Sequence, residues 1–229
     1  MRRALRILST ALITAGVVVL VDAGLMLVWK EPMSTVYGSI QQGAAEDELA
    51  ELERTFRFRV AELDSESRAR ADTGGADGGR AARGVGSLAR VLEREVGTGE
   101  GIGRIEIARI DLDAVIVEGT DTGTLRKGPG RYPDTAFPGQ GRTVGIAGHR
   151  TTYLAPFRNI DEIEDGDEIV LEMPYATFTY EVQKHEIVDP SQVAIVRDVG
   201  YERLVLTACH PLYSAAQRYA VFAKRIETS

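Results

Sequence analysis

Cysteine and histidine are scarce in this sequence, which has one cysteine, Cys209, and three histidines among its 229 residues. A single cysteine excludes an intramolecular disulfide, and a structural zinc site of the usual kind needs several Cys or His ligands. We therefore expect neither a disulfide framework nor a bound metal. A lone cysteine is more often a small buried apolar residue than a nucleophile, so the neighbours of Cys209 must decide its role.

Basic residues are outnumbered by acidic ones. The chain has 27 Lys and Arg against 34 Asp and Glu, which gives a formal net charge of −7. This balance argues against nucleic acid as a partner, because phosphate binding requires clustered Lys and Arg. It also argues against peripheral electrostatic attachment to a membrane. Any membrane attachment must come from an apolar segment.

One long apolar run occupies residues 7–29 and follows a basic segment, residues 1–6, with three arginines. At about 1.5 Å per helical residue, the run is long enough to cross a hydrocarbon core of ~30 Å. The sequence therefore predicts a single-pass anchor in the plasma membrane, with a cytoplasmic N-terminus and an extracellular domain. The alternative is a cleaved signal peptide, which the length of the run and the lack of a small-residue cleavage site disfavour.

Residues 30–98 are predicted to form an extracellular stalk. Within it, residues 41–70 are rich in Ala, Glu, Leu and Arg, and their apolar residues recur at near-helical spacing: Leu49, Leu52, Phe56 and Leu63. We expect a solvated helix without a partner rather than a coiled-coil dimer, because the heptads are too few. Residues 72–87 are rich in glycine and predict a flexible tether, and residues 88–96 predict a short helix.

Residues 99–229 have the pattern of a β-domain. Apolar residues alternate over 105–107 and 110–112 and are continuous over 115–117, which predicts two short strands with a turn near Asp113. Further strands are predicted at 143–149, 167–173, 177–188, 203–209 and 218–227. Gly-Pro turns separate them, and residues 153–163 have room for one helical turn. Many short strands with few helices indicate a small antiparallel barrel or sandwich.

Cys209 closes the predicted strand 203–209 and is followed by His-Pro. A strand end is a rigid place to present a thiol, and Pro211 takes the chain out of the sheet. This position favours an exposed cysteine. Because a free thiol with a pKa of about 8.5 is mostly protonated near neutral pH, a base or a cation has to lie nearby for Cys209 to act as a nucleophile.

Three histidines are candidates for that base. In an extended chain, His210 points away from the face of its neighbour Cys209. His185 lies inside a strand-like run beside charged residues and is interpreted as an ordinary exposed histidine. His149 ends a predicted strand and precedes a loop, which makes it the best-placed acid or base. Arg218 begins the strand after Cys209; it is either a guanidinium for a developing oxyanion or a surface arginine with a carboxylate partner.

Three motifs together resemble the sortases, which are cysteine transpeptidases on the outer face of Gram-positive cells. They are a strand ending in LTACHP, an upstream AGHRTTY and an arginine nine residues after the cysteine. The match is closest to the class E group of actinobacteria and covers about 130 residues, including GPGRYPDTAFPGQ. The resemblance implies an all-β fold, an eight-stranded β-barrel with short helices.

The resemblance also implies roles for particular residues. By motif, His149 corresponds to the catalytic histidine, Cys209 to the nucleophile and Arg218 to the catalytic arginine. The family cleaves a sorting signal of the LPxTG kind, or LAxTG in class E, between Thr and Gly, forms a thioester and passes the acyl group to an amine of a cell-wall precursor. No metal or organic cofactor is implied. The implied partners are surface proteins that carry the signal, the cell-wall amine and the membrane.

Three further residues are implied to bind substrate: Tyr153, Thr207 and Ala208. Ala208 stands where many relatives have threonine, which bears on specificity and not on the reaction. Housekeeping anchoring is the expected role, with pilus polymerisation as an alternative. An exported L,D-transpeptidase ranks lower, because in those enzymes His and Cys share one Gly-rich motif. The alternative outside the enzymes is a non-catalytic binding module tethered to the cell surface.

Overall fold

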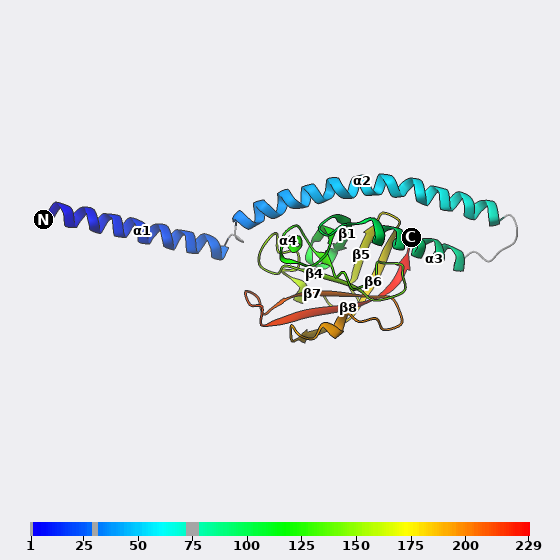
Figure 1. Ribbon diagram of the computed structural model, residues 1–229. Coiled ribbons are helices and arrows are strands. Elements are labelled where there is room, and N and C mark those ends of the chain that lie inside the picture. The colour runs from blue at the N-terminus through cyan, green and yellow to red at the C-terminus, as the bar shows by residue number, and fades with distance from the viewer. Residues whose placement is uncertain (1, 29–31, 72–77) are drawn as a thin grey trace.

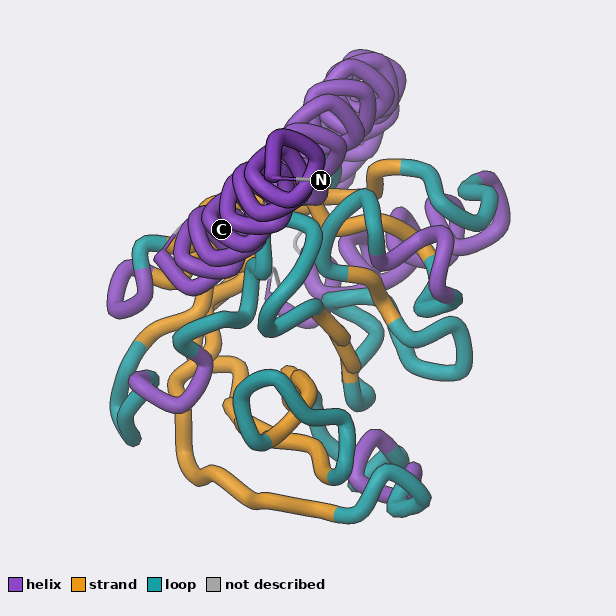
Figure 2. Tube along the Cα trace, turned by 90° about the vertical axis from the view of Figure 1, so that its left-hand side faces the viewer, coloured by secondary structure: helices purple, strands orange, loops and turns teal. Residues whose placement is uncertain are grey.

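A computed structural model of the chain describes residues 2–28, 32–71 and 78–229. Three helices come first: α1 (Arg2–Val28), α2 (Pro32–Ala71) and α3 (Gly78–Glu95). Figure 1 shows α2 running along one side of a body built of strands, and Figure 2 shows the same arrangement from a perpendicular direction.

Helix α1 covers most of the predicted membrane anchor. Within the described residues, no helix combines the length and the apolar character that crossing a membrane requires. The span predicted for residues 7–29 is therefore not found in the structure, and its last residue, Trp29, lies outside the described residues.

Eight strands form one closed barrel: β1 (Gly101–Ile107), β2 (Leu112–Glu118), β3 (Gly130–Arg131), β4 (Val144–Gly148), β5 (Glu168–Met173), β6 (Ala176–Val188), β7 (Arg203–His210) and β8 (Gln217–Thr228). Their order around the barrel is β1-β2-β3-β4-β7-β8-β6-β5. Short helical segments connect them: η1 (Ala108–Ile110), α4 (Thr122–Leu125), η2 (Ile160–Glu162) and η3 (Val193–Val196). The expected eight-stranded barrel with short helices is confirmed.

The prediction of a purely antiparallel sheet is wrong at two places. Strand β2 pairs with β3, and β4 with β7, in parallel. The segment between β4 and β7 holds the hairpin β5–β6, so it is long enough for the crossover that parallel neighbours require. The first predicted strands also differ, because 105–112 is interrupted by η1 and by Asp111, whose φ of 51° turns the chain into β2.

The hydrophobic core follows the alternation of side chains along the strands. In β7, Leu204 and Leu206 belong to the barrel core, whereas Val205 packs in a separate outer cluster. In β8, Val221 is in the core, and Phe222 is in the outer cluster. Because successive side chains of a strand point to opposite faces, these residues establish which face of each strand looks into the barrel.

Helix α2 packs against the barrel, which corrects the expectation of a solvated helix without a partner. Its buried residues follow one helical stripe: Ala45, Leu49 and Phe56, with Leu52 partly buried. The side chain of Leu63 lies outside the described ones. The amide of Gln42 donates to the carbonyls of Val115 and Lys127 at 3.1 and 2.6 Å and accepts from Val115 N–H at 2.8 Å. An apolar stripe and a saturated amide therefore attach α2 to the barrel.

Helix α3 also belongs to this folded unit. Leu88, Ala89 and Leu92 are buried in the barrel's core cluster, which confirms a helix over 88–96 up to Glu95. The helix begins at Gly78, so the predicted tether is helical from there to residue 87; residues 72–77 lie outside the described ones. The hydrophobic core thus extends upstream of residue 99, where the catalytic domain is expected to begin.

Replacing Phe56 tests whether α2 is part of the folded unit. Phe56 is fully buried and contacts the ring of Tyr175, with centroids 6.4 Å apart. We expect Phe56→Ala to lower the free energy of unfolding by about 3–5 kcal/mol, because it leaves a cavity in the core. Phe58, which is 79% exposed on the same helix, is the matched control, and Phe58→Ala should change stability by less than about 0.5 kcal/mol. Equal effects in denaturant titrations would show that α2 does not dock.

Candidate active site

The three expected catalytic residues meet at the ends of three neighbouring strands. In the β7–β8 ladder, Cys209 lies opposite Arg218. In the parallel β4–β7 ladder, Gly148 lies beside Ala208, so the next residues along the two strands, His149 and Cys209, are also neighbours. The barrel thus brings together a thiol, an imidazole and a guanidinium that are far apart in the sequence.

The thiol and the guanidinium share the outer face of the barrel. Ala208 belongs to the core cluster, and Tyr219 packs against it. Alternation then places their neighbours Cys209 and Arg218 on the other face. Cys209 is half-buried and unpaired, so its position at the strand end allows contact with a substrate.

Gly148 and Phe157 hold the backbone of His149. A Cβ atom at residue 148 would lie 2.5 Å from Cδ2 of Phe157, a distance that real Cβ atoms do not tolerate. Phe157 is fully buried, and its N–H donates to the carbonyl of His149 at 3.0 Å. The glycine before the histidine therefore makes room for an aromatic ring that closes the loop back onto the strand end.

Tyr153 packs against the imidazole of His149, with ring centroids 5.2 Å apart. Three successive residues of this loop, Tyr153, Leu154 and Ala155, have positive φ values of 50°, 67° and 45°. Helix α2 supports this turn: a Cβ atom on Gly38 would lie 2.8 Å from Cγ of Leu154. Because non-glycine residues adopt the left-handed region only where the surroundings enforce it, the contact with α2 contributes to the shape of the loop.

The surroundings of His149 favour its neutral form. Burial lowers the pKa of His149, and the nearby Arg126 cation lowers it further. The Arg126 guanidinium also lies over the ring of Tyr153, 5.4 Å from its centroid. Nε2 of His149 is buried and has no hydrogen-bond partner in the described part of the chain. The ring therefore has a nitrogen available for exchanging a proton with a thiol or with a substrate.

Arg218 is not held by a carboxylate within the described residues. Its Nη1 donates to the carbonyls of Ala215 and Gln217 at 3.0 and 2.9 Å, and none of the ion pairs among the described residues involves it. The alternative reading, a surface arginine paired with Asp or Glu, is not supported. The guanidinium retains donors for a group bound beside Cys209.

A groove runs next to the thiol. A cavity of about 310 Å³ is lined by Thr207 and Arg218 on the strands and by the segment 188–197, which includes η3. Much of that segment is apolar: Val188, Val193, Ile195 and Val196. An elongated hollow with apolar walls and a few polar groups is typical of a ligand site. Of its lining residues, Arg218 lies opposite Cys209 in the β7–β8 ladder, and Thr207 precedes Cys209 by two residues on the same face of β7.

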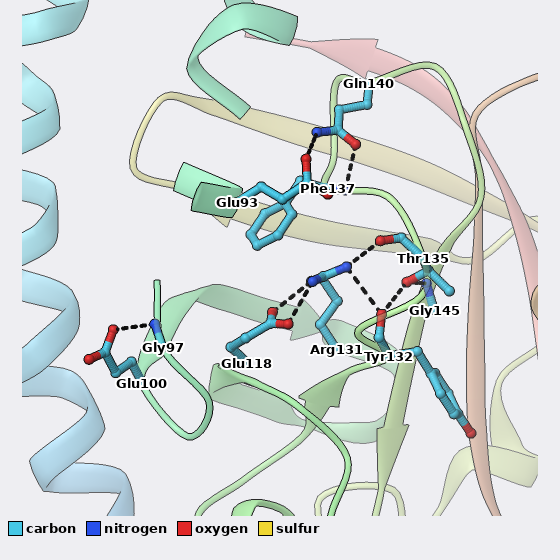
Figure 3. Close-up of polar contacts among 10 residues, drawn as sticks. All are labelled: Glu93, Gly97, Glu100, Glu118, Arg131, Tyr132, Thr135, Phe137, Gln140 and Gly145. Carbon is cyan, nitrogen blue, oxygen red and sulfur yellow. Dashed lines mark hydrogen bonds and ion pairs between the residues drawn. The ribbon is translucent and has the colours of Figure 1, made fainter. Parts of the chain in front are cut away.

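A buried ion pair shapes the wall of the groove (Figure 3). Arg131 binds both oxygens of Glu118 at 2.6 and 2.7 Å, and donates to the carbonyls of Tyr132 and Thr135. The neighbouring Tyr132 hydroxyl bonds Oγ1 of Thr207 at 2.8 Å. Because a buried arginine needs all its donors satisfied, this arrangement fixes the turn that brings Tyr132 to the groove.

The expected substrate-binding residues differ in their surroundings. Tyr153 lies against His149. Thr207 lines the groove and is hydrogen-bonded to Tyr132, which also lines it. Ala208 is 2% exposed and belongs to the barrel core, so its side chain faces away from the groove. His185 was expected to be exposed; its side chain is only 21% exposed, and Nδ1 lies 3.3 Å from Asp165.

Two residues of the site were not predicted from the sequence: Arg126 beside His149 and Tyr132 in the groove. Arg126 carries no local signal, because it precedes β3 and reaches the histidine only through the fold. Tyr132 lies within the GPGRYPDTAFPGQ segment of the resemblance, which is a usable signal. Among the described residues, no cluster of His, Cys, Asp and Glu is suited to hold a metal.

Comparisons with known proteins place the chain among characterised domains. A sortase domain model matches residues 105–226. Sortase D of Bacillus subtilis (strain 168) is 38% identical over 133 residues, which cover 56% of this chain and 66% of the relative. Sortase SrtE1 of Streptomyces coelicolor is 30% identical over 145 residues, which cover 56% and 41%. The structure of sortase E from Streptomyces avermitilis aligns with a TM-score of 0.54 and 32% identity, covering 58% of this chain and 92% of that one.

The alignments span less than two thirds of the length of both curated relatives. The region matched by the domain model nevertheless makes up more than half of this chain and contains the three strand ends with His149, Cys209 and Arg218. The chain belongs to the sortase family.

Proposed function

We propose that this chain is a cysteine transpeptidase that cleaves an LAxTG- or LPxTG-like sorting signal between Thr and Gly and transfers the acyl group to a cell-wall amine. One observation supports the proposal: Cys209 pairs with Arg218 in the β7–β8 ladder, and His149 directly follows Gly148, the β4 partner of Ala208, next to a cavity lined by Thr207 and Arg218. Family membership supports the reaction class, and the choice of signal rests on the resemblance of the sequence motifs to class E sortases.

The first half of the proposed reaction is acylation. The Cys209 thiolate attacks the carbonyl carbon of the signal's threonine, and a tetrahedral oxyanion forms. Arg218 and nearby backbone N–H groups donate hydrogen bonds to that oxyanion, as charge develops there only in the transition state. Protonated His149 gives its proton to the glycine nitrogen as the C–N bond breaks. The products are a Cys209 thioester and a released peptide with a free amine.

The second half is transfer. The acceptor amine attacks the thioester carbonyl, and neutral His149 takes a proton from that amine. The C–S bond breaks, an amide forms and the Cys209 thiolate is regenerated. The lowered pKa of His149 suits the second half, because the neutral ring is the form that accepts a proton.

The groove supports binding of an extended peptide. Its apolar wall at 188–197 suits the aliphatic residues of the signal, and Thr207 and Arg218 lie where the scissile bond must reach Cys209. Since Ala208 faces the core, its difference from the threonine of many relatives acts through packing behind the nucleophile. A membrane anchor is not needed for any of these steps.

The decisive test is product analysis by mass spectrometry. The full chain is incubated with an LAxTG peptide or an LPxTG peptide, together with either a cell-wall-type amine or a lysine-containing peptide. We expect cleavage between Thr and Gly, transfer to the cell-wall-type amine and faster turnover of the alanine signal. Preferred transfer to the lysine peptide would indicate a pilus-type enzyme.

Cys209→Ala is the matched inactive control, because it removes only the sulfur nucleophile. We expect no thioester and no product from this variant. Turnover that persists in Cys209→Ala would contradict the assignment. If the wild-type chain binds a signal peptide but never cleaves it, a binding module replaces the enzyme as the better description.

Arg126 adds to the effect of burial on the pKa of His149. Replacing Arg126 by Met removes a cation, so the pKa of His149 should rise, although burial still holds it below its ordinary value. The pH at which His149 loses the proton it donates as the acid should rise together with this pKa. NMR titration of the His149 ring and the pH profile of kcat/KM measure both effects. Arg126→Lys keeps the charge and should shift neither much; an unchanged His149 titration in Arg126→Met would refute the coupling.

Arg218→Lys separates geometry from charge at the oxyanion. Lysine keeps the positive charge but lacks the planar fork of donors. We expect kcat to fall by roughly 100-fold, as observed when a single oxyanion donor is removed from other enzymes, with little change in stability. Steady-state kinetics and thermal unfolding give the two readouts. Wild-type kinetics in this variant would mean that Arg218 is only structural.

A further inference from the structure

A second cluster lies directly behind the first. Each expected catalytic residue is followed in the chain by a residue that joins this cluster: Arg150, His210 and Tyr219. Nη1 of Arg150 lies 3.0 Å from Nδ1 of His210. The rings of His210 and Tyr219 are 5.8 Å apart, and the Arg150 guanidinium carbon lies 5.9 Å from the centre of the Tyr219 ring.

Strand alternation explains why the two clusters lie back to back. Cys209 and Arg218 are on the outer face of the barrel, so His210 and Tyr219 are on the inner face. Tyr219 packs against the barrel core, in agreement with this assignment. Arg150 reaches the same place from the loop that follows β4. The inner cluster therefore closes the end of the barrel beneath the reacting groups.

Arg150 is buried, and its donors connect three segments. Its side chain is only 3% exposed. Besides His210, it binds Asp161 Oδ2 in η2 at 2.5 Å, and its Nε donates to the carbonyl of Arg158 at 3.2 Å. A guanidinium has donors only, so Nδ1 of His210 must be the acceptor and the ring carries its hydrogen on Nε2. Removing either partner would leave a buried charge incompletely satisfied.

Other charged groups surround this cluster without replacing these bonds. Asp165 lies next to His185, whose ring is 5.9 Å from that of Tyr219. Burial and the neighbouring Asp161 raise the pKa of Tyr219, so this phenol is neutral and acts through its ring. The described structure thus gives Arg150 one carboxylate, one imidazole and one carbonyl as bonding partners.

We propose that Arg150 is a positioning residue, which joins the loop of His149 to the strand of Cys209 through His210 and thereby sets the geometry of the acid and the nucleophile. The inference rests on the proposed function for what the geometry is used for. It assigns a role to the arginine of the GHR sequence and to the histidine of the CHP sequence. Neither residue lines the cavity formed by Thr207, Arg218 and the segment 188–197, and each is assigned an effect through its neighbour in the chain, His149 or Cys209.

The role predicts a specific kinetic signature. Misplacing a reacting group by about 1 Å can cost 100-fold in rate while binding is kept. Loss of the Arg150–His210 bond should therefore lower kcat by roughly 10- to 100-fold with KM within about threefold of wild type. A residue that is merely structural would change the fraction of folded enzyme and leave the kcat of the folded fraction unchanged.

The experiment compares four variants of the full chain: Arg150→Met, His210→Leu, His210→Asn and Arg142→Met. Asparagine places its amide oxygen near the position of Nδ1, so His210→Asn keeps the acceptor that leucine lacks. Arg142 is exposed and, among the described residues, is shown to bond Gln140, so its variant controls for the loss of a positive charge. Each variant is characterised by thermal unfolding, by kcat and KM with the sorting peptide, and by the pH dependence of iodoacetamide alkylation at Cys209.

We expect Arg150→Met and His210→Leu to lose kcat and to change the pH dependence of alkylation, and His210→Asn and Arg142→Met to retain both. Rescue by asparagine is the result that distinguishes positioning from packing. Equal loss in His210→Leu and His210→Asn, or wild-type kcat in folded Arg150→Met, would overturn the proposal. If Arg150→Met does not fold, the two His210 variants decide.

The alkylation arm separates this inference from the proposed function. If wild-type enzyme cleaves no peptide, the transpeptidase proposal fails, but the reaction of Cys209 with iodoacetamide still reports its surroundings. An alkylation profile that changes in His210→Leu and returns in His210→Asn would then still support positioning. Identical profiles in all folded variants would refute it.

Discussion

The parallel pairing of β4 with β7 is the constraint on which the site depends. These strands are separated in the sequence by the β5–β6 hairpin, and their register sets Gly148 beside Ala208. The next residue along each chain carries a reactive side chain: the imidazole of His149 after Gly148, and the thiol of Cys209 after Ala208. A slip of one residue would move one group to the opposite face of the barrel. The hydrogen-bonded ladder is thus the main determinant of which groups can react together.

Two buried arginines stabilise the loops around that ladder. Arg131, paired with Glu118, holds the turn that carries Tyr132 to the groove. Arg150, paired with Asp161, connects the histidine loop to His210 behind the nucleophile. Arg131 binds two backbone carbonyls and Arg150 binds one, each in addition to its carboxylate, so each constrains more than one segment. Because both guanidiniums are buried, loss of either carboxylate would leave a buried charge without its ionic partner.

Helix α2 extends this constraint beyond the barrel. Its apolar stripe is buried in the core, and its first turns contact the loop that carries Tyr153 and Leu154. The rings of Tyr37 and Tyr153 meet edge to face at 6.1 Å. Tyr153 in turn lies against His149. A helix that precedes the barrel in the chain therefore contributes to the surroundings of the acid–base residue.

The strands from residue 143 onward can be predicted from their apolar runs, because such runs are buried on a β-surface whatever their partners are. Local motifs also singled out His149, Cys209 and Arg218, and their resemblance to a family indicated the barrel. Other features emerge only in the folded chain: the parallel pairings, the docking of α2, the inward orientation of Ala208, and the contacts of Arg126, Tyr132 and Arg150. Each of these joins residues that are distant in the chain. Local periodicity reports which face of an element is apolar, but partner and register are set only when non-local contacts form and close the barrel.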